Sequence, residues 1–284
     1  MTAKNYIKTA LLLGALTGLL LVVGRLLGGA TGLTIAIVFS VLMNFGALFV
    51  ADKLVLAMYR AYEAKGAEYK GLREMVGEIA EKAGLPKPRV YIIPSDNPNA
   101  FATGRSPKHA VVAVTQGILK LLNKEELRGV IAHELSHIKN RDMLVATVAA
   151  TIAGVISYLA YMARFAAIFG GGSRDSRDSG GIFGLLALAI LTPIIAMILQ
   201  LAISRSREYL ADESGARTIK NPKALASALA KLEAASKIVP MRRGNPTTSS
   251  LFIVNPFSAK GLTGLFSTHP STESRIQKLN SLVI

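Results

Sequence analysis

The sequence predicts a mainly α, multi-pass membrane protein that carries an α+β domain on one side of the membrane. Two observations predict this class: long apolar runs without charge, and a basic excess confined to the segments between them. The 284 residues combine a positive mean hydropathy, +0.39, with a formal net charge of +15. This hydropathy excludes intrinsic disorder. The absence of cysteine excludes disulfide frameworks and thiol nucleophiles.

Four uncharged stretches are long enough, the first with its flanking residues, to cross a bilayer as helices, because about 20 apolar residues suffice. Lys8 and Arg25 bracket the first stretch and can reach the membrane interfaces. Pro193 is expected to kink the fourth. The alternatives are a cleaved signal peptide for the first stretch and buried helices of a soluble domain for the third and fourth. The stretches are residues 9–24, 26–51, 143–163 and 179–204.

The basic residues predict the orientation of these spans. Of the 33 Lys and Arg, 29 lie in residues 1–8, 53–141 and 205–284. By the positive-inside rule both termini and both polar segments are cytoplasmic, and the protein is a multi-pass protein of the cell membrane. The positive charge therefore belongs to a bilayer surface, and no nucleic-acid partner is expected. The predicted organisation is two spans in 1–52, a cytoplasmic part in 53–142, two spans in 143–204 and a second cytoplasmic part in 205–284.

The cytoplasmic parts contain both helix and strand patterns. Helices are expected at residues 69–82, 119–122, 124–139, 222–236 and 271–282. Short β-rich runs punctuated by Pro, Asn and Gly occur at 89–94, 99–104 and 110–115. Residues 239–268 are rich in Pro, Gly, Ser and Thr. The two parts together predict one α+β domain that is split by the third and fourth spans.

One short motif carries metal chemistry. His133, Glu134 and His137 form an HExxH pattern within the helix expected at 124–139. Residues four apart share one helix face, so both imidazoles can approach one ion, while Glu134 can reach a water at the metal. Two histidines, a carboxylate and an open position suit zinc. The alternative is a coincidental pattern on a surface helix.

A third ligand must come from another segment. His109 and His269 are the other histidines, and Glu208 and Asp212 lie four apart on a helix that continues from the fourth span. Two spans separate His137 from Glu208, so both lie on the same side of the membrane. The alternative for the two acids is pairing with Arg205 and Arg207 on the surface.

Three motifs in this order resemble the HtpX family of membrane zinc metalloproteases, relatives of the CAAX prenyl proteases. They are HELSHIKNRD at residues 133–142, SREYLAD at 206–212 and THPSTESRI at 268–276. With two spans before the first motif and two after it, the resemblance covers nearly the whole chain. It implies a gluzincin-like zinc protease domain with one zinc ion per chain.

The resemblance also implies roles for individual residues. Glu208 would complete the zinc site beside His133 and His137, and Asp212 would orient a ligand histidine. Glu134 would act as the general base and then the general acid. His269 and Arg275 would either stabilise the tetrahedral intermediate or hold the carboxylate ligand. The alternative for His269 and Arg275 is that they belong to the start of a helix that Thr268 or Ser271 caps.

A substrate peptide can pair as an extra strand with a sheet edge. Residues Asn99, Ala100 and Phe101, in the run 99–103, are the candidate edge strand, and residues 110–114 are a second candidate. The alternative is that both runs are internal strands of the sheet.

The predicted activity is hydrolysis of peptide bonds in membrane or misfolded proteins at the cytoplasmic face, as in protein quality control. His137 is six residues before Met143, and Glu208 is four residues after Ser204, so the zinc is expected close to the membrane surface. Alternatives are a non-proteolytic scaffold or metal-binding protein, and a prenyl-protein processing protease. A site-2-type protease would carry HExxH inside a span, whereas charged residues flank this motif. The oligomeric state is not predicted.

Overall fold

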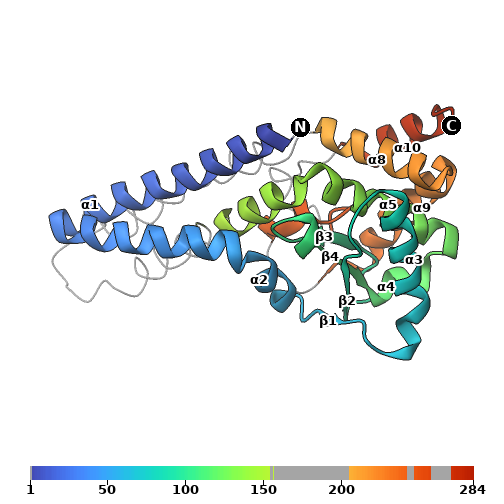
Figure 1. Ribbon diagram of the computed structural model, residues 1–284, viewed down its shortest axis with the longest axis horizontal. Helices are drawn as coiled ribbons and strands as arrows, with labels where there is room; N and C mark the ends of the chain where they lie inside the picture. Colours follow the sequence, from blue (N-terminus) through green and yellow to red (C-terminus); the bar gives the residue numbers. More distant parts are fainter. Residues whose placement is uncertain (1, 154–155, 157–204, 242–245, 257–269) are drawn as a thin grey trace.

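A computed structural model describes residues 2–153, 156, 205–241, 246–256 and 270–284. The last part of the predicted third span, residues 143–163, and the whole of the fourth, residues 179–204, lie outside these ranges, and so does His269. The described part has an α/β body from which the N-terminal helical arms project (Figure 1).

Helix α1 (Thr2–Phe49) forms two antiparallel arms (Figure 1). The chain reverses at Gly29, whose φ of +59° lies in the left-handed region that glycine adopts without penalty. The side chain of Asn44 on the second arm donates a hydrogen bond of 2.9 Å to the Thr17 hydroxyl on the first. The predicted pair of N-terminal helices is therefore present as a hairpin.

Among the described residues, one helical stretch is long and apolar enough to cross a membrane, Gly29–Phe49. The first arm, Ile7–Val22, and the helix Asp142–Ala153 are shorter apolar stretches. Leu12, Leu16 and Leu20 of the first arm pack against the helix Asp142–Ala153. Large apolar side chains of the second arm, including Ile35, Leu42 and Phe45, are more than half exposed, as expected for a surface that faces lipid. Four spans remain a prediction.

Helix α2 (Ala51–Met58), strand β1 (Tyr62–Glu63) and a 3-10 turn (Ala67–Tyr69) connect the hairpin to α3 (Lys70–Lys82). Helix α3 lies where its apolar pattern predicts, with Leu72, Val76 and Ile79 buried. The sequence analysis did not identify α2 or β1. Both are too short for their periodicity to stand out from the flanking segments.

The sheet contains β2 (Arg89–Ile93), β3 (Ala100–Thr103) and β4 (Val111–Thr115), as the β-rich runs predict. Its order is β1-β2-β4-β3, with β2 parallel to β4 and the other two pairs antiparallel. Strand β4 pairs on both sides, so the prediction that residues 110–114 offer a free edge is wrong. Strand β3 is one of the two edge strands, and β1 is the other.

The remaining helices pack around α5 (Lys124–Asn140), which is buried along most of its length beside the sheet. Helices α8 (Arg205–Ile219) and α9 (Pro222–Ile238) contact α5, and α10 (Thr272–Asn280) contacts both of them. A short α4 (Gln116–Leu121) precedes α5, and a 3-10 segment (Pro246–Leu251) lies within the predicted irregular stretch. Buried residues of the segments 53–142 and 205–284 thus share one core, and the division of one domain by two spans stays a prediction.

Candidate metal and active site

The N-terminus of α5 is fixed by a reciprocal capping arrangement. The Asn123 side chain accepts a hydrogen bond from the Glu126 N–H, and the Glu126 carboxylate accepts one from the Asn123 N–H. The same carboxylate accepts a hydrogen bond from the Ser227 hydroxyl and pairs with Lys231 at 2.8 Å, and both partners lie on α9. This arrangement satisfies two backbone donors that the helix leaves unpaired, and it holds the helix that carries HExxH against α9.

The C-terminus of α5 is set by Arg141, which adopts a left-handed conformation with φ +58°. Its N–H bonds back to the Ile138 carbonyl at 3.1 Å, which ends the helix. The chain turns at once into the next helix. Asp142, the first residue of that helix, consequently lies beside His137, with 3.4 Å between Oδ2 and the ring Nδ1.

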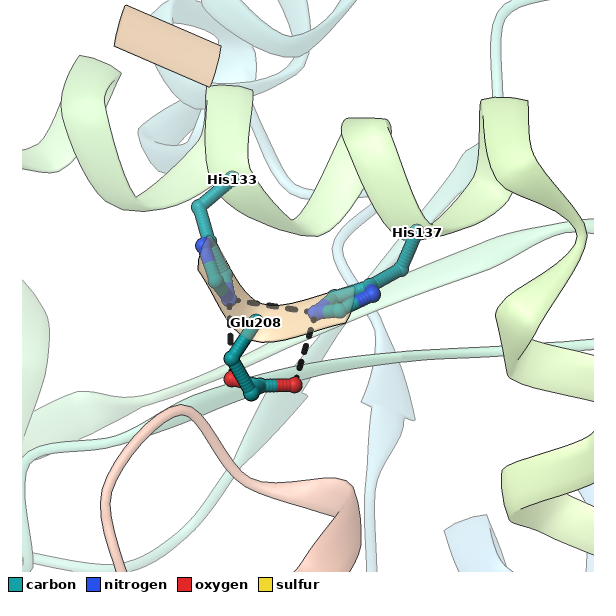
Figure 2. Close-up of side chains that lie close together, drawn as sticks. All are labelled: His133, His137 and Glu208. Atoms are coloured by element: carbon teal, nitrogen blue, oxygen red, sulfur yellow. Dashed lines mark hydrogen bonds and ion pairs between the residues drawn. The ribbon is translucent and has the colours of Figure 1, made fainter. Parts of the chain in front are cut away.

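The predicted ligand set meets at one point. Figure 2 shows the rings of His133 and His137 on one side of α5, facing the carboxylate of Glu208 from α8. The two Nε2 atoms are 3.2 Å apart, and Glu208 oxygens lie 3.4 Å from the His137 Nε2 and 3.8 Å from the His133 Nε2. Tetrahedral zinc with bonds of about 2.1 Å separates its ligand atoms by about 3.4 Å. The three donor atoms therefore fit a zinc ion.

The contacts around the two rings are compatible with a bound cation. Each Nδ1 faces a carboxylate, Asp212 at 2.8 Å from His133 and Asp142 at 3.4 Å from His137. A metal ion binds neutral imidazole, so with an ion bound the remaining ring proton of each histidine would lie on Nδ1, facing its carboxylate. Both Nε2 lone pairs then point toward each other and toward Glu208, an arrangement that a cation stabilises.

Asp212 is held by Arg275 from α10. The Arg275 Nε and Nη2 donate to the two carboxylate oxygens of Asp212 at 2.8 and 2.7 Å, and Nη1 donates to the Ile253 carbonyl. Burial acts to raise the pKa of Asp212, but the Arg275 charge and hydrogen bonds outweigh it and lower the pKa to about 2. Asp212 is therefore ionised and can accept the proton of the His133 Nδ1.

Arg275 itself is 1% exposed, and its Nη1 is 3.7 Å from Glu208. Arg275 thus lies near the predicted carboxylate ligand, and its role, to hold that carboxylate or to stabilise the tetrahedral intermediate, stays a prediction. All three guanidinium nitrogens of Arg275 donate hydrogen bonds, two to Asp212 and one to the Ile253 carbonyl. His269 lies outside the described residues.

Glu134 occupies the position required of a base. It is 2% exposed and lines a cavity of about 40 Å³ together with His133, His137 and Glu208. That volume admits a water molecule. Burial raises the pKa of Glu134 to about 7, with a further contribution from Glu208, while the charge of His137 and a hydrogen bond from the Ala102 backbone oppose the rise. A carboxylate with such a pKa can both take up and release a proton near neutral pH.

The predicted edge strand lies next to this cavity but is partly covered. The Ala100 carbonyl accepts a hydrogen bond from the Ile253 N–H, and the Asn99 side chain bonds the Val254 carbonyl. Phe101 is buried against Phe252. Ala102, one residue beyond the predicted set, lines the cavity.

Two residues of the site were missed in the sequence. Asp142 and Arg207 line the cavity, and they form an ion pair at 3.6 Å. Asp142 is part of the HELSHIKNRD motif, five residues after His137, but nothing in a helix pattern indicates the left-handed turn that brings it back. Arg207 precedes Glu208, and its orientation depends on where α8 lies.

Three comparisons with known proteins show what the chain is similar to. The sequence model of a family described as Peptidase family M48 matches residues 66–283. Proteins named "Protease HtpX homolog" from Persephonella marina and Thermococcus kodakarensis are each 55% identical, covering 96% and 98% of this chain and 96% of their own lengths. A homologue of the same name from Pyrococcus furiosus is 51% identical over 98% of this chain and 96% of its own.

A solved structure has the same fold at low sequence identity. The crystal structure of Ste24p from S. mikatae aligns with 94% of this chain at a TM-score of 0.51 and 19% identity. This chain spans 62% of that protein's length. The likeness concerns the fold alone.

Proposed function

The chain belongs to peptidase family M48, and from this premise we propose that it hydrolyses peptide bonds of membrane or misfolded proteins at the cytoplasmic face of a membrane. The HtpX relatives confirm the resemblance found in the motifs. Together with the family match they identify the protein as a membrane-associated metalloendopeptidase. The finer proposal concerns its metal, the roles of its residues, and where its substrates lie.

The observation that carries the proposal is the convergence of His133, His137 and Glu208. Their ligand atoms all lie within 4.8 Å of one another. We propose that these three side chains hold one zinc ion. When bound, zinc supplies Lewis acidity that polarises the scissile carbonyl and makes a water molecule easier to deprotonate.

Glu134 carries the proton transfer in this proposal. Its buried carboxylate takes a proton from the attacking water and returns it to the amine nitrogen of the departing peptide. Asp212, held by Arg275, keeps the His133 ring in the orientation that directs its Nε2 toward the metal. We assign Arg275 to this positioning role, and we retain His269 as a candidate donor to the tetrahedral oxyanion.

The size of the cavity supports an extended substrate. About 40 Å³ beside a buried Glu134 is far too small for a folded domain, so a substrate segment would have to be extended where it reaches Glu134. An extended segment can pair with the β3 edge near Ala102. If the substrate displaced the hydrogen bond from the Ile253 N–H to the Ala100 carbonyl, a longer part of the β3 edge would be open to it. That longer edge would include the predicted positions Asn99 and Phe101.

The membrane location of the substrate rests on chain connectivity and charge. Asp142 begins an apolar helix that packs on the α1 arms, and it lies beside the metal ligand His137. The basic residues of the polar segments favour the cytoplasmic side. We therefore propose four spans, with residues 53–142 and 205–284 forming one cytoplasmic protease domain.

The experiment compares the full chain with its Glu134→Gln variant, both purified in detergent or nanodiscs. Peptide cleavage of a misfolded membrane protein and bound zinc are measured for both. We expect zinc content to be unchanged and the cleavage rate to fall by about 10²- to 10⁴-fold. Equal cleavage by a zinc-loaded variant would contradict the assigned role of Glu134, and absence of zinc from the parent would contradict the metal site.

A further inference from the structure

We propose that Asp142 is a positioning residue for His137 and that Arg207 holds Asp142 in place. The site then contains two Arg–Asp–His chains, one for each histidine: Arg275–Asp212–His133 and Arg207–Asp142–His137. The inference rests on the metal site proposed above, and it adds the residues that orient the second ligand.

The first chain sets the pattern. Asp212 lies 2.8 Å from the His133 Nδ1, and Arg275 donates to both of its oxygens. All three side chains are nearly inaccessible to solvent. A carboxylate in this position fixes the ring orientation and makes the opposite nitrogen a better ligand.

The second chain repeats the connectivity with longer contacts. One Asp142 oxygen lies 3.4 Å from the His137 Nδ1, and the other lies 3.6 Å from the Arg207 Nη1. The Asp142 and Arg207 side chains are 7% and 13% exposed, so their interaction is shielded from water. Asp142 is therefore placed to accept the Nδ1 proton of His137, as Asp212 does for His133.

The position of the second chain in the sequence has a consequence for function. Asp142 is the first residue of the helix Asp142–Ala153, and Arg207 is the third residue of α8. These two residues flank the stretch predicted to form the third and fourth spans. The helix that Asp142 begins packs through Val145, Val148 and Ile152 on the α1 arms. A shift of the helix Asp142–Ala153 against the α1 arms would consequently move Asp142 and change the orientation of His137.

A simpler role for Asp142 is stabilisation of the helix that it begins, because an acid in the first turn interacts favourably with the helix dipole. That role predicts an effect on stability alone. A positioning role predicts an effect on metal affinity and on the ligand field at the metal.

The experiment measures metal binding by the full chain in nanodiscs, in the Glu134→Gln background so that self-cleavage cannot interfere. Zinc affinity is measured by competition with a chelator, and the absorption spectrum of the cobalt-substituted protein reports on ligand geometry. For Asp142→Ser we expect zinc affinity to fall by about 10- to 100-fold and the cobalt spectrum to change. The melting temperature of the metal-free protein should also fall, because Arg207 loses its carboxylate partner, so the zinc affinity and the cobalt spectrum carry the test.

Arg207 variants test the second link. Arg207→Gln should weaken zinc binding, Arg207→Lys should restore part of it, and Arg207→Gln should have no further effect once Asp142→Ser is present. Glu78→Gln is the matched control, because it removes the partner of Arg128, which is 13% exposed like Arg207, and neither Glu78 nor Arg128 lines the cavity beside the predicted ligands. It should leave zinc affinity and the cobalt spectrum unchanged.

The outcomes separate this inference from the proposed function. If Asp142→Ser binds zinc as the parent does, with the same cobalt spectrum, Asp142 does not position His137 even though the metal site stands. A fall in melting temperature alone would likewise assign Asp142 to the helix start. If the parent itself binds no zinc, the metal site is wrong and both proposals fall.

Discussion

Gly215 of α8 packs directly against the backbone of His133 in α5. A Cβ atom at Gly215 would lie 2.8 Å from the His133 nitrogen and 3.0 Å from the Ala132 carbonyl carbon, closer than such atoms approach in proteins. The two helices cross at this point, two turns after Glu208. Their close approach sets how far the Glu208 carboxylate reaches toward the histidines.

Replacement of Gly215 by alanine should push α8 away from α5. We expect a loss of about 1–3 kcal/mol in the free energy of unfolding and weaker zinc binding, because the added methyl group meets backbone atoms that cannot move independently. Chemical unfolding and zinc competition measure the two effects. Gly71→Ala in α3 is the control: nothing lies within 4 Å of its Cβ position, and this change should be neutral or stabilising. Unchanged zinc affinity in Gly215→Ala would contradict the role of this crossing.

Removal of the Arg275 charge should destabilise the protein strongly. Arg275→Gln leaves the Asp212 carboxylate buried without its guanidinium, for which we expect a loss of about 3–5 kcal/mol. Arg217→Gln breaks an exposed pair with Glu213 and should change stability by less than about 1 kcal/mol. Adding Asp212→Asn to Arg275→Gln should recover part of the loss, as measured by chemical unfolding. No recovery would mean that the buried charge is not the cause.

Acid should weaken the attachment of α5 to α9 through Glu126. Burial acts to raise the pKa of Glu126, but the hydrogen bonds from Lys231, Ser227 and the Asn123 N–H outweigh it and lower the pKa below 4.5. The stability that this carboxylate adds is thus present above its unfolded pKa and is lost as the pH falls through the lower folded pKa.

The measurement compares the wild type with Glu126→Gln in urea unfolding across a pH series. The wild type should be the more stable near neutral pH, and the difference should shrink between about pH 5 and about pH 2. Both proteins share all other carboxylates, so the difference isolates Glu126. A difference that does not vary with pH would exclude the ionised carboxylate as its cause.

Metal removal and ligand replacement test which of the two acids on α8, Glu208 or Asp212, binds the metal directly. A chelator should lower the melting temperature, since a ligand that binds only the folded protein at 100 times its Kd adds about 2.7 kcal/mol. Glu208→Ala should lower the zinc content sharply, and Asp212→Ala should lower it less, because Asp212 acts through His133. Zinc content measured by elemental analysis decides this, and the reverse order would exchange the two roles.

The local features of the site were predictable. His133 and His137 share a face because helix periodicity puts residues four apart on one side, and the same argument relates Glu208 to Asp212. Helices α3, α5, α9 and α10 and strands β2, β3 and β4 were expected near their observed positions. Each of these inferences depends on residues close together in the chain.

The contacts between distant segments were not predictable. Strand β4 is internal rather than an edge because β3 folds back onto its outer side, and residues 253–254 bond Ala100 and Asn99 across some 150 positions of the chain. The Arg207 pair with Asp142 and the Gly215 contact with His133 likewise depend on where α8 lies.

The sequence alone determined the chemistry of this protein: its apolar stretches, its basic segments, and the set of imidazoles and carboxylates that a metalloprotease requires. The tertiary structure decided the geometry: which acid approaches the metal ligands from which side, which arginine holds each acid, and how closely α8 packs on α5. The physical reason is that residue type and helix periodicity act over a few positions, whereas orientation within a buried site follows from how whole elements pack against one another.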